Sequence, residues 1–597
     1  MKIRKLIASA LLFSSIASVA SPSVMASGLT DAFTTADDTA LYEEAPMVLW
    51  YDEEAPYGQE NTSFGDGGKP NDPNDGWERW SLPLGNGYFG ANVFGRTATE
   101  RIQLTEKTLC NDYGSSTYNP GGLNNFSETY IDFGHAFDSV SEYSRSLDLK
   151  TAISSVSYVY DGVTYNREYF TSYEDYCMVI KLTASEDGKL SFTLRPTIPY
   201  LQDFAYDNND TTRSKLMDVT KHGKVTSSVT SDGAVINMSG NMGQYDVDFE
   251  AQYRVFTDGN VEAGTWTNVY STNVVAGISD EFNSGVRDAV NQTLTVTNGT
   301  LEISGATEAY IVITLGTNYD QSAAEGNSSI YTTGSNSAKL DVAGIDAKAA
   351  NDARMASALA NSFGAYSDIT EGYEALRARH VADYSDLFGR VNFTLDFDEE
   401  DLNRTTDELL ARYKNDEGDG AYLVMLYYQY GRYLLIASSR ETTLPANLQG
   451  TWNRYNYSPW GVGYWHNINE QMNYWHAFST DLSECFGGYV NFIDAYIEQA
   501  RKNAATELSR APFNYKGSDT GFTIGIGITP YKVGSSASCG ELGFTTQMFW
   551  EYYQFTNDEQ ILREVVYPIL YEAAQFITKT VAYNESEDAY QIGRAHV

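Results

Sequence analysis

The sequence predicts a chain of several domains, in which an amino-terminal antiparallel β-sandwich is followed by a helical linker and then by a helical domain. Three observations predict this order. Alternating apolar and polar residues, broken by turn dipeptides, fill residues 47–345, a pattern typical of antiparallel strands. Apolar residues change to helical spacing near residue 346. At 597 residues, the chain is also too long for a single hydrophobic core.

Composition limits the classes of partner. The chain carries 40 Lys and Arg against 79 Asp and Glu, a net charge of -39 at pH 7. Such a chain would repel a phosphate backbone, so we exclude nucleic acid as a partner. An acidic surface is typical of a soluble extracellular protein. Aromatic residues make up 14% of the chain, and this excess fits a carbohydrate-active protein and a Tyr-rich sandwich core equally well.

The first residues have the pattern of a bacterial secretory signal peptide. Basic residues lie within the first five positions, an apolar run extends from Leu6 to Val19, and Ala26 supplies the small residue of a cleavage site. The apolar run is too short to span a membrane, and no other stretch approaches that length. We therefore expect residues 1–26 to be removed, residues 27–46 to form a flexible leader, and the mature protein to be secreted without a membrane partner.

Cofactor motifs are not visible in the sequence, and we expect no metal and no cofactor. The four cysteines lack the paired short spacing of a zinc site; they are Cys110, Cys177, Cys485 and Cys539. An exported chain could hold a Cys485–Cys539 disulfide, but a buried free thiol is the expected state of each. Gly85, Gly87 and Gly90 are spaced like a phosphate loop. No helix or Lys-Ser/Thr follows them, so we interpret them as turns between strands.

Turn dipeptides mark the hairpins of the predicted sandwich. Val156, Tyr158 and Tyr160 alternate with other residues up to Asp161-Gly162, and the alternation then resumes. This is a strong hairpin signal, because both residues of a type I′ turn need positive φ. Similar turns are expected at Asp187-Gly188, Asp232-Gly233, Asp258-Gly259 and Asn298-Gly299. About 300 residues of such hairpins predict a large sandwich.

Helical spacing begins with the linker, which we place at residues 346–415. The residues that carry the spacing are Tyr373, Leu376, His380, Tyr384 and Leu387. They predict a helix over residues 368–388, in which His380 is structural rather than catalytic.

A helical domain is expected over residues 416–591. Residues 421–439 are apolar nearly all round, so we expect a helix that is buried on every side and ended by Leu444-Pro445. Further helices are expected over residues 470–480, 484–508, 541–555 and 558–583, the last with a kink at Pro568.

The stretch from Leu444 to His476 is dense in Trp, Tyr, His and Asn. Asn and Gln carry donors and an acceptor on one planar group, and Trp offers a flat apolar face. Together they suit a sugar, which alternates hydroxyls with C–H faces. Asn467 and Asn469 do not share a helix face, so we interpret them as part of a loop or extended segment just before a helix. The alternative is that they only cap that helix.

This stretch closely resembles the signature of glycoside hydrolase family 95. Four other segments resemble the family in the same order along the chain. Leu82–Ala91 and Glu100–Leu109 are similar to its amino-terminal signatures, His380–Tyr384 to its linker, and Trp550–Asp558 to a later helix. The resemblance runs from about residue 47 to the end of the chain.

The resemblance implies both a fold and an activity. The fold would be a β-super-sandwich over residues 47–345, a helical linker, and an incomplete catalytic (α/α)6 barrel over residues 416–591. The activity would be that of a secreted exo-glycosidase that removes terminal α-linked L-fucose, or L-galactose, from glycans with inversion at the anomeric carbon. The implied partner is therefore a fucosylated or L-galactosylated oligosaccharide.

The resemblance also implies the catalytic residues. Family members hold the attacking water with two asparagine amides, which correspond to Asn467 and Asn469. An inverting glycosidase also needs a general acid. The family's acid, the Glu of a Ser-Pro-Glu segment, and an aspartate that helps the amides both fall beyond residue 597. An amide cannot take up a proton permanently, so we expect the chain as written to be inactive.

Two positions of the expected sugar pocket depart from the family. Trp465 lies where the fucosidases carry His and the L-galactosidases carry Thr, at a position that faces the C5 substituent of the sugar, so fucose as the substrate stays open. The small run 535–538 replaces a region that tends to carry Trp. His466 could supply the missing imidazole from one residue later, or it could pack against Trp460 or Tyr464.

Other candidate substrate-binding residues are assigned from their position alone. Trp460 and Trp465 lie beside glycines and are expected to be exposed in a loop, where they could stack on sugar rings. Trp475 follows Met472 at helical spacing and is expected in the core. Asn447 and Gln449 lie in the loop after the helix and are further candidates for contact with the glycan.

Two alternative functions stay open. A disaccharide phosphorylase has a similar layout but needs basic residues near its phosphate, and Arg454 is the single Lys or Arg between residues 444 and 476. A non-catalytic glycan-binding protein would share the aromatic pocket. The last residues, 592–597, read like a translated sequencing adapter, so we interpret them as an artefact without a function.

Overall fold

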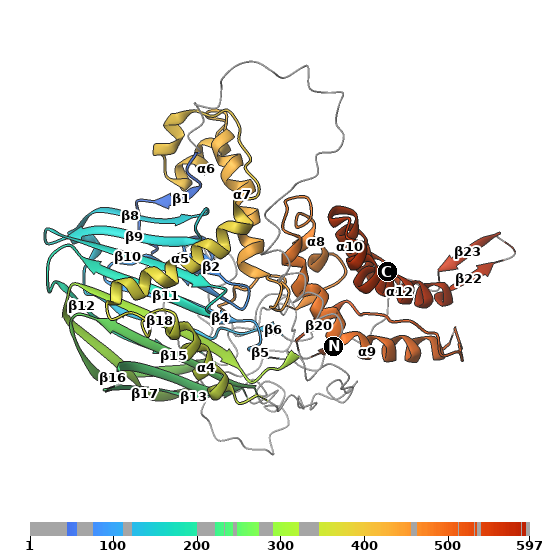
Figure 1. Ribbon diagram of the computed structural model, residues 1–597, viewed down its shortest axis with the longest axis horizontal. Helices are drawn as coiled ribbons and strands as arrows, with labels where there is room; N and C mark the ends of the chain where they lie inside the picture. Colours follow the sequence, from blue (N-terminus) through green and yellow to red (C-terminus); the bar gives the residue numbers. More distant parts are fainter. Residues whose placement is uncertain are drawn as a thin grey trace.

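The computed structural model confirms a β-sandwich followed by a helical region (Figure 1). The signal peptide and nearly all of the leader, the run 535–538 and residues 593–597 lie outside the residues that it describes. The structure describes residues 45–56, 76–111, 122–199, 221–231, 233–242, 247–273, 291–321, 345–454, 463–511, 513–530, 532–533, 539–584, 586 and 588–592.

Two antiparallel sheets form the sandwich. The first has nine strands in the order β1 (Val48–Tyr51), β8 (Val140–Asp148), β9 (Ile153–Tyr160), β10 (Val163–Ser172), β11 (Cys177–Ala184), β18 (Glu308–Thr317), β15 (Val247–Thr257), β14 (Gly233–Met242) and β13 (Lys221–Thr230). The second has seven strands in the order β16 (Asn260–Asn273), β17 (Asn291–Ala306), β12 (Leu190–Thr197), β7 (Ser127–Asp132), β4 (Thr99–Glu106), β3 (Phe89–Val93) and β2 (Leu82–Gly85). A short helix α2 (Gly76–Arg79) precedes β2, and β5 (Cys110–Asn111) pairs with β6 (Gly122–Leu123).

The turn dipeptides predict most, but not all, of the strand connections. Asp161 and Gly162 have φ of 50° and 79° and join β9 to β10 as a type I′ hairpin, as predicted. The turn expected at Asn298-Gly299 is wrong, because both residues lie inside β17, opposite Trp266 and Thr265 of β16. A Cβ on Gly299 would collide with the backbone of Ser227 in the facing sheet. The glycine there allows close packing of two sheets rather than a turn.

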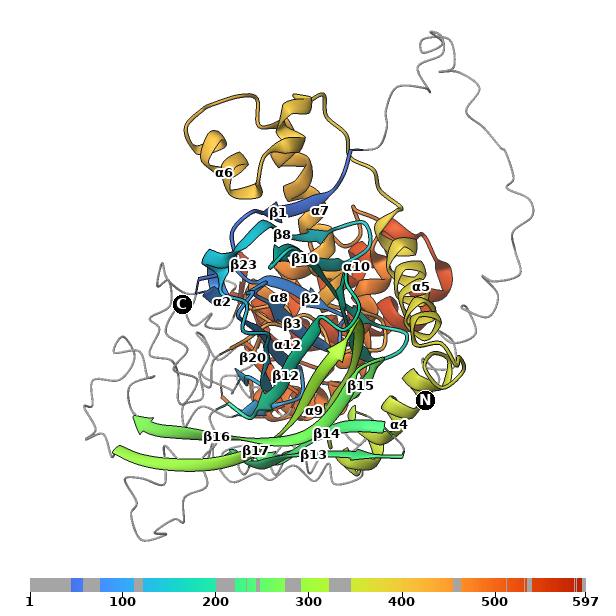
Figure 2. The same cartoon turned by 90° about the vertical axis from the view of Figure 1, so that its left-hand side faces the viewer.

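Helices α4 (Ala347–Ala360) and α5 (Ile369–Phe388) cover the outer face of the nine-stranded sheet (Figure 2). Successive residues of a strand point to opposite faces. In β11, Met178 and Ile180 therefore enter the core between the sheets, whereas Val179 packs under α4 and α5. The predicted helix over 368–388 is confirmed. His380 is structural, as expected: its Nε2 lies 2.8 Å from the Thr151 carbonyl, and burial lowers its pKa to about 4.

The helical region is made of short and long helices around a buried aromatic core. Its helices are α6 (Thr406–Lys414), α7 (Ala421–Ser438), α8 (Asn469–Tyr474), α9 (Gly487–Ser509), α10 (Cys539–Thr556), α11 (Glu559–Ile561) and α12 (Tyr567–Thr580). Its strands are β19 (Tyr464–Trp465), β20 (Gly527–Thr529), β21 (Lys532–Val533), β22 (Val581–Asn584) and β23 (Ala589–Ile592). The helix expected over 558–583 is interrupted by a π turn at Leu562–Val566, just before Pro568. In the part of the chain that is described, no helix is both long and apolar enough to cross a membrane.

Two expectations about α7 are wrong. The helix ends at Ser438, six residues before Leu444-Pro445. It is also not buried on every side: Tyr427 is 79% exposed and Val424 40% exposed. Apolar residues all round a helix show only that it tolerates burial; α7 packs against α5, α6 and the sandwich strands β2 and β3, and these leave Val424 and Tyr427 exposed.

Three of the cysteines are free and buried, namely Cys110, Cys177 and Cys485. The Cys485–Cys539 disulfide that the sequence allowed is therefore not formed. Burial raises the pKa of the Cys485 thiol to about 12, so it stays a protonated thiol at neutral pH and behaves as a small apolar side chain.

Three glycines of the amino-terminal signature fit the sandwich against α7 and the loop after it. Of the three glycines expected in turns, only Gly87 lies in one, with φ of 83° between β2 and β3, which Gly adopts without strain. The expectation is wrong for Gly85, which ends β2, and for Gly90, which lies inside β3. A Cβ on Gly85 would collide with the Ala437 carbonyl at the end of α7. A Cβ on Gly90 would lie 2.6 Å from Cδ1 of Trp452 and 2.8 Å from the Thr451 carbonyl.

We expect Gly90→Ala to destabilise the contact between the sandwich and the loop that carries Trp452. The extra methyl group has no free space, and overpacking of this kind costs about 1–3 kcal/mol. Denaturant unfolding of both proteins measures the difference. Gly543→Ala in α10 is the control, because a Cβ there meets nothing within 4 Å. Equal stability of Gly90→Ala and the parent protein would contradict the packing described.

Candidate active site

The two candidate asparagines lie where a tight turn after β19 leads into α8. Asn467 is exposed in this turn, and Asn469 is half-buried as the first residue of α8. Strand β19 fixes the start of the turn, because Tyr464 and Trp465 pair with Ile528 and Gly527 of β20. The helix was expected just after the pair, and it begins at its second member.

Neither asparagine side chain is engaged elsewhere in the part of the chain that is described. The residue at the amino-terminal cap of α8 is Ile468, and no side chain caps this helix. The alternative that Asn467 and Asn469 only cap α8 therefore has no support in the geometry. Their amides retain donors and acceptors for a ligand or a water molecule.

His466 anchors the turn from inside the protein. Its ring is fully buried, Nδ1 lies 3.0 Å from the Tyr464 carbonyl, and its backbone N–H donates to the Ile526 carbonyl over 2.7 Å. The ring packs against Tyr489, with centroids 5.8 Å apart. Burial lowers the pKa of His466 to about 4, so the imidazole is neutral at pH 7. A buried neutral ring in this position holds the turn and is remote from solvent.

The candidate tryptophans have three different outcomes. Trp465 is half-buried in β19 rather than exposed in a loop. Trp460 lies outside the described residues. Trp475, which was expected in the core, is 52% exposed. Its helical spacing from Met472 was correctly recognised, but Met472 itself lies on an open face of α8 and is 48% exposed.

Asn447 and Gln449 belong to a tight turn that is tied to α8. Asn447 is buried, accepts a hydrogen bond from the backbone N–H of Gln449 (2.9 Å), and pairs with Gly450 through two backbone hydrogen bonds. Asn473 of α8 donates to the Asn447 carbonyl over 2.9 Å. Asn447 therefore shapes the turn, whereas the Gln449 side chain lines a cavity.

Residues that the sequence interpretation missed hold α8 in place. The Gln471 amide donates to the His466 carbonyl (2.7 Å) and to Thr545 of α10 (3.2 Å). The Tyr474 hydroxyl accepts from the Ala446 N–H (2.9 Å) and lies 2.7 Å from the Ser439 hydroxyl. The sequence signal that could have identified Gln471 and Tyr474 was their position in the same short helix as Asn469.

A buried carboxyl group and a buried amine lie directly behind the turn. Glu470 is 1% exposed, and neither of its oxygens has a hydrogen-bond partner. Lys107 of the sandwich donates to the Leu444 carbonyl over 2.6 Å and to the Ser438 carbonyl at the end of α7. Burial raises the pKa of Glu470 well above its usual value and lowers that of Lys107 to about 7, although each charge favours the other. Desolvation dominates for both groups.

We expect Glu470→Gln to change how stability depends on pH. Glu470 keeps its proton in the folded state but loses it near pH 4.5 when unfolded, so this residue makes the unfolding free energy fall as pH rises above 4.5. The slope is at most about 1.4 kcal/mol per pH unit. Urea unfolding between pH 5 and 6.5, where Lys107 stays mainly charged, should give a shallower fall for Glu470→Gln. Parallel curves for the two proteins would contradict the buried neutral carboxyl.

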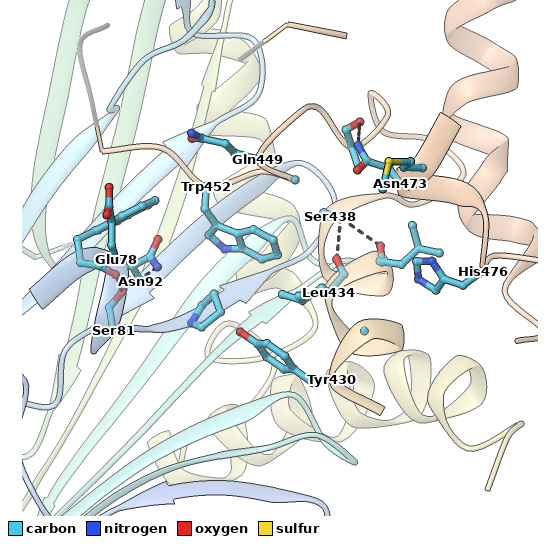
Figure 3. A pocket seen from close by; sticks show the side chains of 17 residues that line it. Glu78, Ser81, Asn92, Tyr430, Leu434, Ser438, Gln449, Trp452, Asn473 and His476 are labelled. Carbon is cyan, nitrogen blue, oxygen red and sulfur yellow. Dashed lines mark hydrogen bonds between the residues drawn. The ribbon is translucent and has the colours of Figure 1, made fainter. Parts of the chain in front are cut away.

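A cavity of about 630 Å³ lies beside the turn, between the sandwich and the helices (Figure 3). Asn92 and Glu78 line it on the sandwich side, and Tyr430 of α7 and His476 on the helical side. Met472 and Asn473 line it from α8, one helical turn after Asn469. Asn469 and two lining residues of this cavity therefore belong to the same short helix.

Comparisons with known families agree with this arrangement. The Glycosyl hydrolase family 95 catalytic domain matches residues 372–595, which include Asn467 and Asn469. The Glycosyl hydrolase family 65 N-terminal domain matches residues 49–124 and 111–322, which cover most of the sandwich.

Two relatives named as fucosidases align with most of the chain. Alpha-L-fucosidase 2 of Arabidopsis thaliana is 25% identical over 539 residues, covering 83% of this chain and 57% of that protein. Probable alpha-fucosidase A of Aspergillus niger is 26% identical over 537 residues, covering 83% and 58%. A putative kojibiose phosphorylase from human microbiome is 9% identical with a TM-score of 0.49, covering 92% of this chain and 62% of that chain, a likeness too low to carry an argument.

This chain thus spans less than two thirds of the length of the two fucosidases. The catalytic-domain match contains the amide pair in its turn before α8, and the two relatives align with most of the chain. Over residues 372–595 the chain is therefore similar to the glycoside hydrolase family 95 catalytic domain.

Proposed function

We propose that the protein is a secreted, inverting exo-glycosidase that removes terminal α-linked L-fucose or L-galactose from glycans. The observation that carries the proposal is the pair of unengaged amides, Asn467 and Asn469, at the start of α8. We assign to them the positioning of the attacking water. Two relatives named as fucosidases support the choice of substrate.

The proposed chemistry divides the work between amides and carboxyl groups. In an inverting hydrolysis, one carboxylic acid protonates the leaving oxygen while a base activates water on the opposite face of the sugar. Amides can orient that water by accepting its hydrogen bonds, but they cannot keep its proton. Asn467 and Asn469 therefore position the water, and a carboxylate must accept the proton. We propose that α7 to α12 belong to an (α/α)6 barrel that brings these groups together.

Trp465 bears on which sugar is bound. It lies two residues before Asn467 and is half-buried, and we assign its bulky apolar side chain to the wall of the sugar site. A methyl group at C5, as in L-fucose, would meet such a surface with less loss of hydration than the hydroxymethyl group of L-galactose. This favours L-fucose, and the assay should include both sugars.

The test begins with the gene. We would sequence it past the codon for Tyr590, express the product of the complete reading frame, and assay it on 2′-fucosyllactose and on an L-galactosyl analogue. Proton NMR of the released sugar at early times reports inversion or retention. Release of β-L-fucose would support the proposal. Phosphate-dependent release of a sugar phosphate would favour a phosphorylase, and binding without release would favour a non-catalytic glycan-binding protein.

A further inference from the structure

We propose that the cavity between the sandwich and α7–α8 is a second sugar-binding site, which holds a neutral sugar unit of the glycan that carries the terminal residue. The inference rests on the proposed function only in its choice of a glycan as ligand. It adds a site separate from the amide pair, one helical turn away along α8.

Residues of both the sandwich and the helical region line the cavity. Figure 3 shows Trp452 and Tyr430 between the sandwich side chains and His476 of the helical region. The Trp452 indole N–H donates to the Leu84 carbonyl over 2.7 Å, which fixes the plane of the ring. A volume of about 630 Å³ lies within the range of about 300–1,000 Å³ for small-molecule sites. Fixed aromatic walls of this size suit the C–H faces of sugar rings.

Three side chains of the lining carry a buried polar atom without a hydrogen-bond partner. These atoms are Asn92 Oδ1, Gln449 Oε1 and His476 Nε2. A buried polar group without a partner is unfavourable, so a ligand that supplies the missing partners is favoured. The three residues come from β3, the loop after α7 and the segment after α8.

The hydrogen bonds of the neighbouring groups fix the character of two of these atoms. Ser81 donates its hydroxyl to the Trp77 carbonyl, so it must accept from the Asn92 amide nitrogen over 3.0 Å, which leaves Asn92 Oδ1 as an unused acceptor. His476 meets the Gly431 carbonyl with its other ring nitrogen, and burial lowers its pKa, so Nε2 of the neutral ring is also an acceptor. A ligand with several hydroxyl donors complements them.

The charge of the lining excludes an anionic ligand. Glu78 is acidic, and no Lys or Arg side chain occurs among the described residues that line the cavity. Phosphate would be repelled by the Glu78 carboxylate and would find no cation to pair with among the described lining residues. A neutral sugar avoids both problems and also provides the apolar surface that Trp452 and Tyr430 require.

Gly431 leaves space in the cavity because it has no side chain, so a larger residue there can test whether the cavity binds a ligand. A Cβ at Gly431 of α7 would meet nothing within 4 Å, and Gly431 lines the cavity. Gly431→Leu should therefore fill the space without strain, and Leu is also a better helix former than Gly. Gly543 of α10 has the same open surroundings and does not line the cavity. Gly543→Leu is the matched control.

The experiment measures binding of lactose, which lacks the terminal sugar, by titration calorimetry and saturation-transfer NMR. We expect Gly431→Leu to weaken lactose binding at least tenfold and Gly543→Leu to leave it unchanged. Gln449→Ala, a half-buried loop variant, should weaken binding severalfold. Far-UV circular dichroism checks that each variant is folded. Inorganic phosphate should not bind at the cavity or compete with lactose.

Three results would overturn the proposal. One is lactose binding of equal strength in Gly431→Leu and the parent protein, and another is no lactose binding at all. The third is binding by the 597-residue protein that disappears in the product of the complete reading frame, which would mean that polypeptide fills the cavity. None of them depends on hydrolysis, so a failure of the proposed enzymatic activity would be seen separately.

Discussion

Asn469→Ala should lower kcat of the complete protein by about 10²–10³-fold while KM changes little. Loss of one preorganised hydrogen-bonding group that acts mainly in the transition state has an effect of this size. Asn467→Ala should behave in the same way. The double variant should be little worse than either single variant, because two groups that hold one water molecule act as a unit. Initial rates on 2′-fucosyllactose measure all three.

The control for this experiment is Asn403→Ala, an exposed asparagine at the end of a short turn in the linker. It should keep the parent rate. The circular dichroism spectra of Asn467→Ala and Asn469→Ala should also match the parent, since neither amide bonds to another described residue. A rise in KM with unchanged kcat would assign the two amides to sugar binding rather than to the water.

Sequence patterns predicted local structure well where the residues involved favour a single backbone conformation. Asp161-Gly162 formed its hairpin because two consecutive residues with positive φ have few alternatives. Asn298-Gly299 looks the same in the sequence but lies inside β17, where the facing strand β13 needs a residue without a side chain. The two dipeptides differ in their tertiary packing, which a pattern of a few neighbouring residues does not reveal.

The candidate site was predicted only in part, for the same reason. A loop just before a helix was expected for Asn467 and Asn469; Asn467 lies in such a turn, whereas Asn469 begins α8. The cavity residues Asn92, Gly431 and His476 come from three distant segments, and only the fold brings them together. Lys107 could not be connected with Glu470 for the same reason. The burial of His466 could not be read from its aromatic neighbours, which would suit an exposed binding loop equally well.

Arg432→Met should destabilise the helical region by about 3–5 kcal/mol, because it leaves several buried carbonyls without a donor. Arg432 is 1% exposed, and its guanidinium donates to the carbonyls of Phe388 (2.7 Å), Leu387 (3.0 Å) and Thr480 (3.3 Å). The first two form the carboxyl-terminal end of α5, where a positive charge is favoured. One side chain therefore joins the linker helix, α7 and the segment after α8.

Arg432→Lys should recover only part of the loss, since a single ammonium group cannot reproduce the planar fork that reaches carbonyls on separate elements. Arg563→Ala is the matched control. Its guanidinium pairs with Glu559 on the surface and is 73% exposed, so its removal should change stability by less than about 0.5 kcal/mol. Denaturant unfolding followed by far-UV circular dichroism measures all three variants. If Arg432→Met unfolded at the same denaturant concentration as Arg563→Ala, the hydrogen bonds of Arg432 would not stabilise the helical region. The linker helix and the helices that carry the amide pair would then be held together by apolar packing alone.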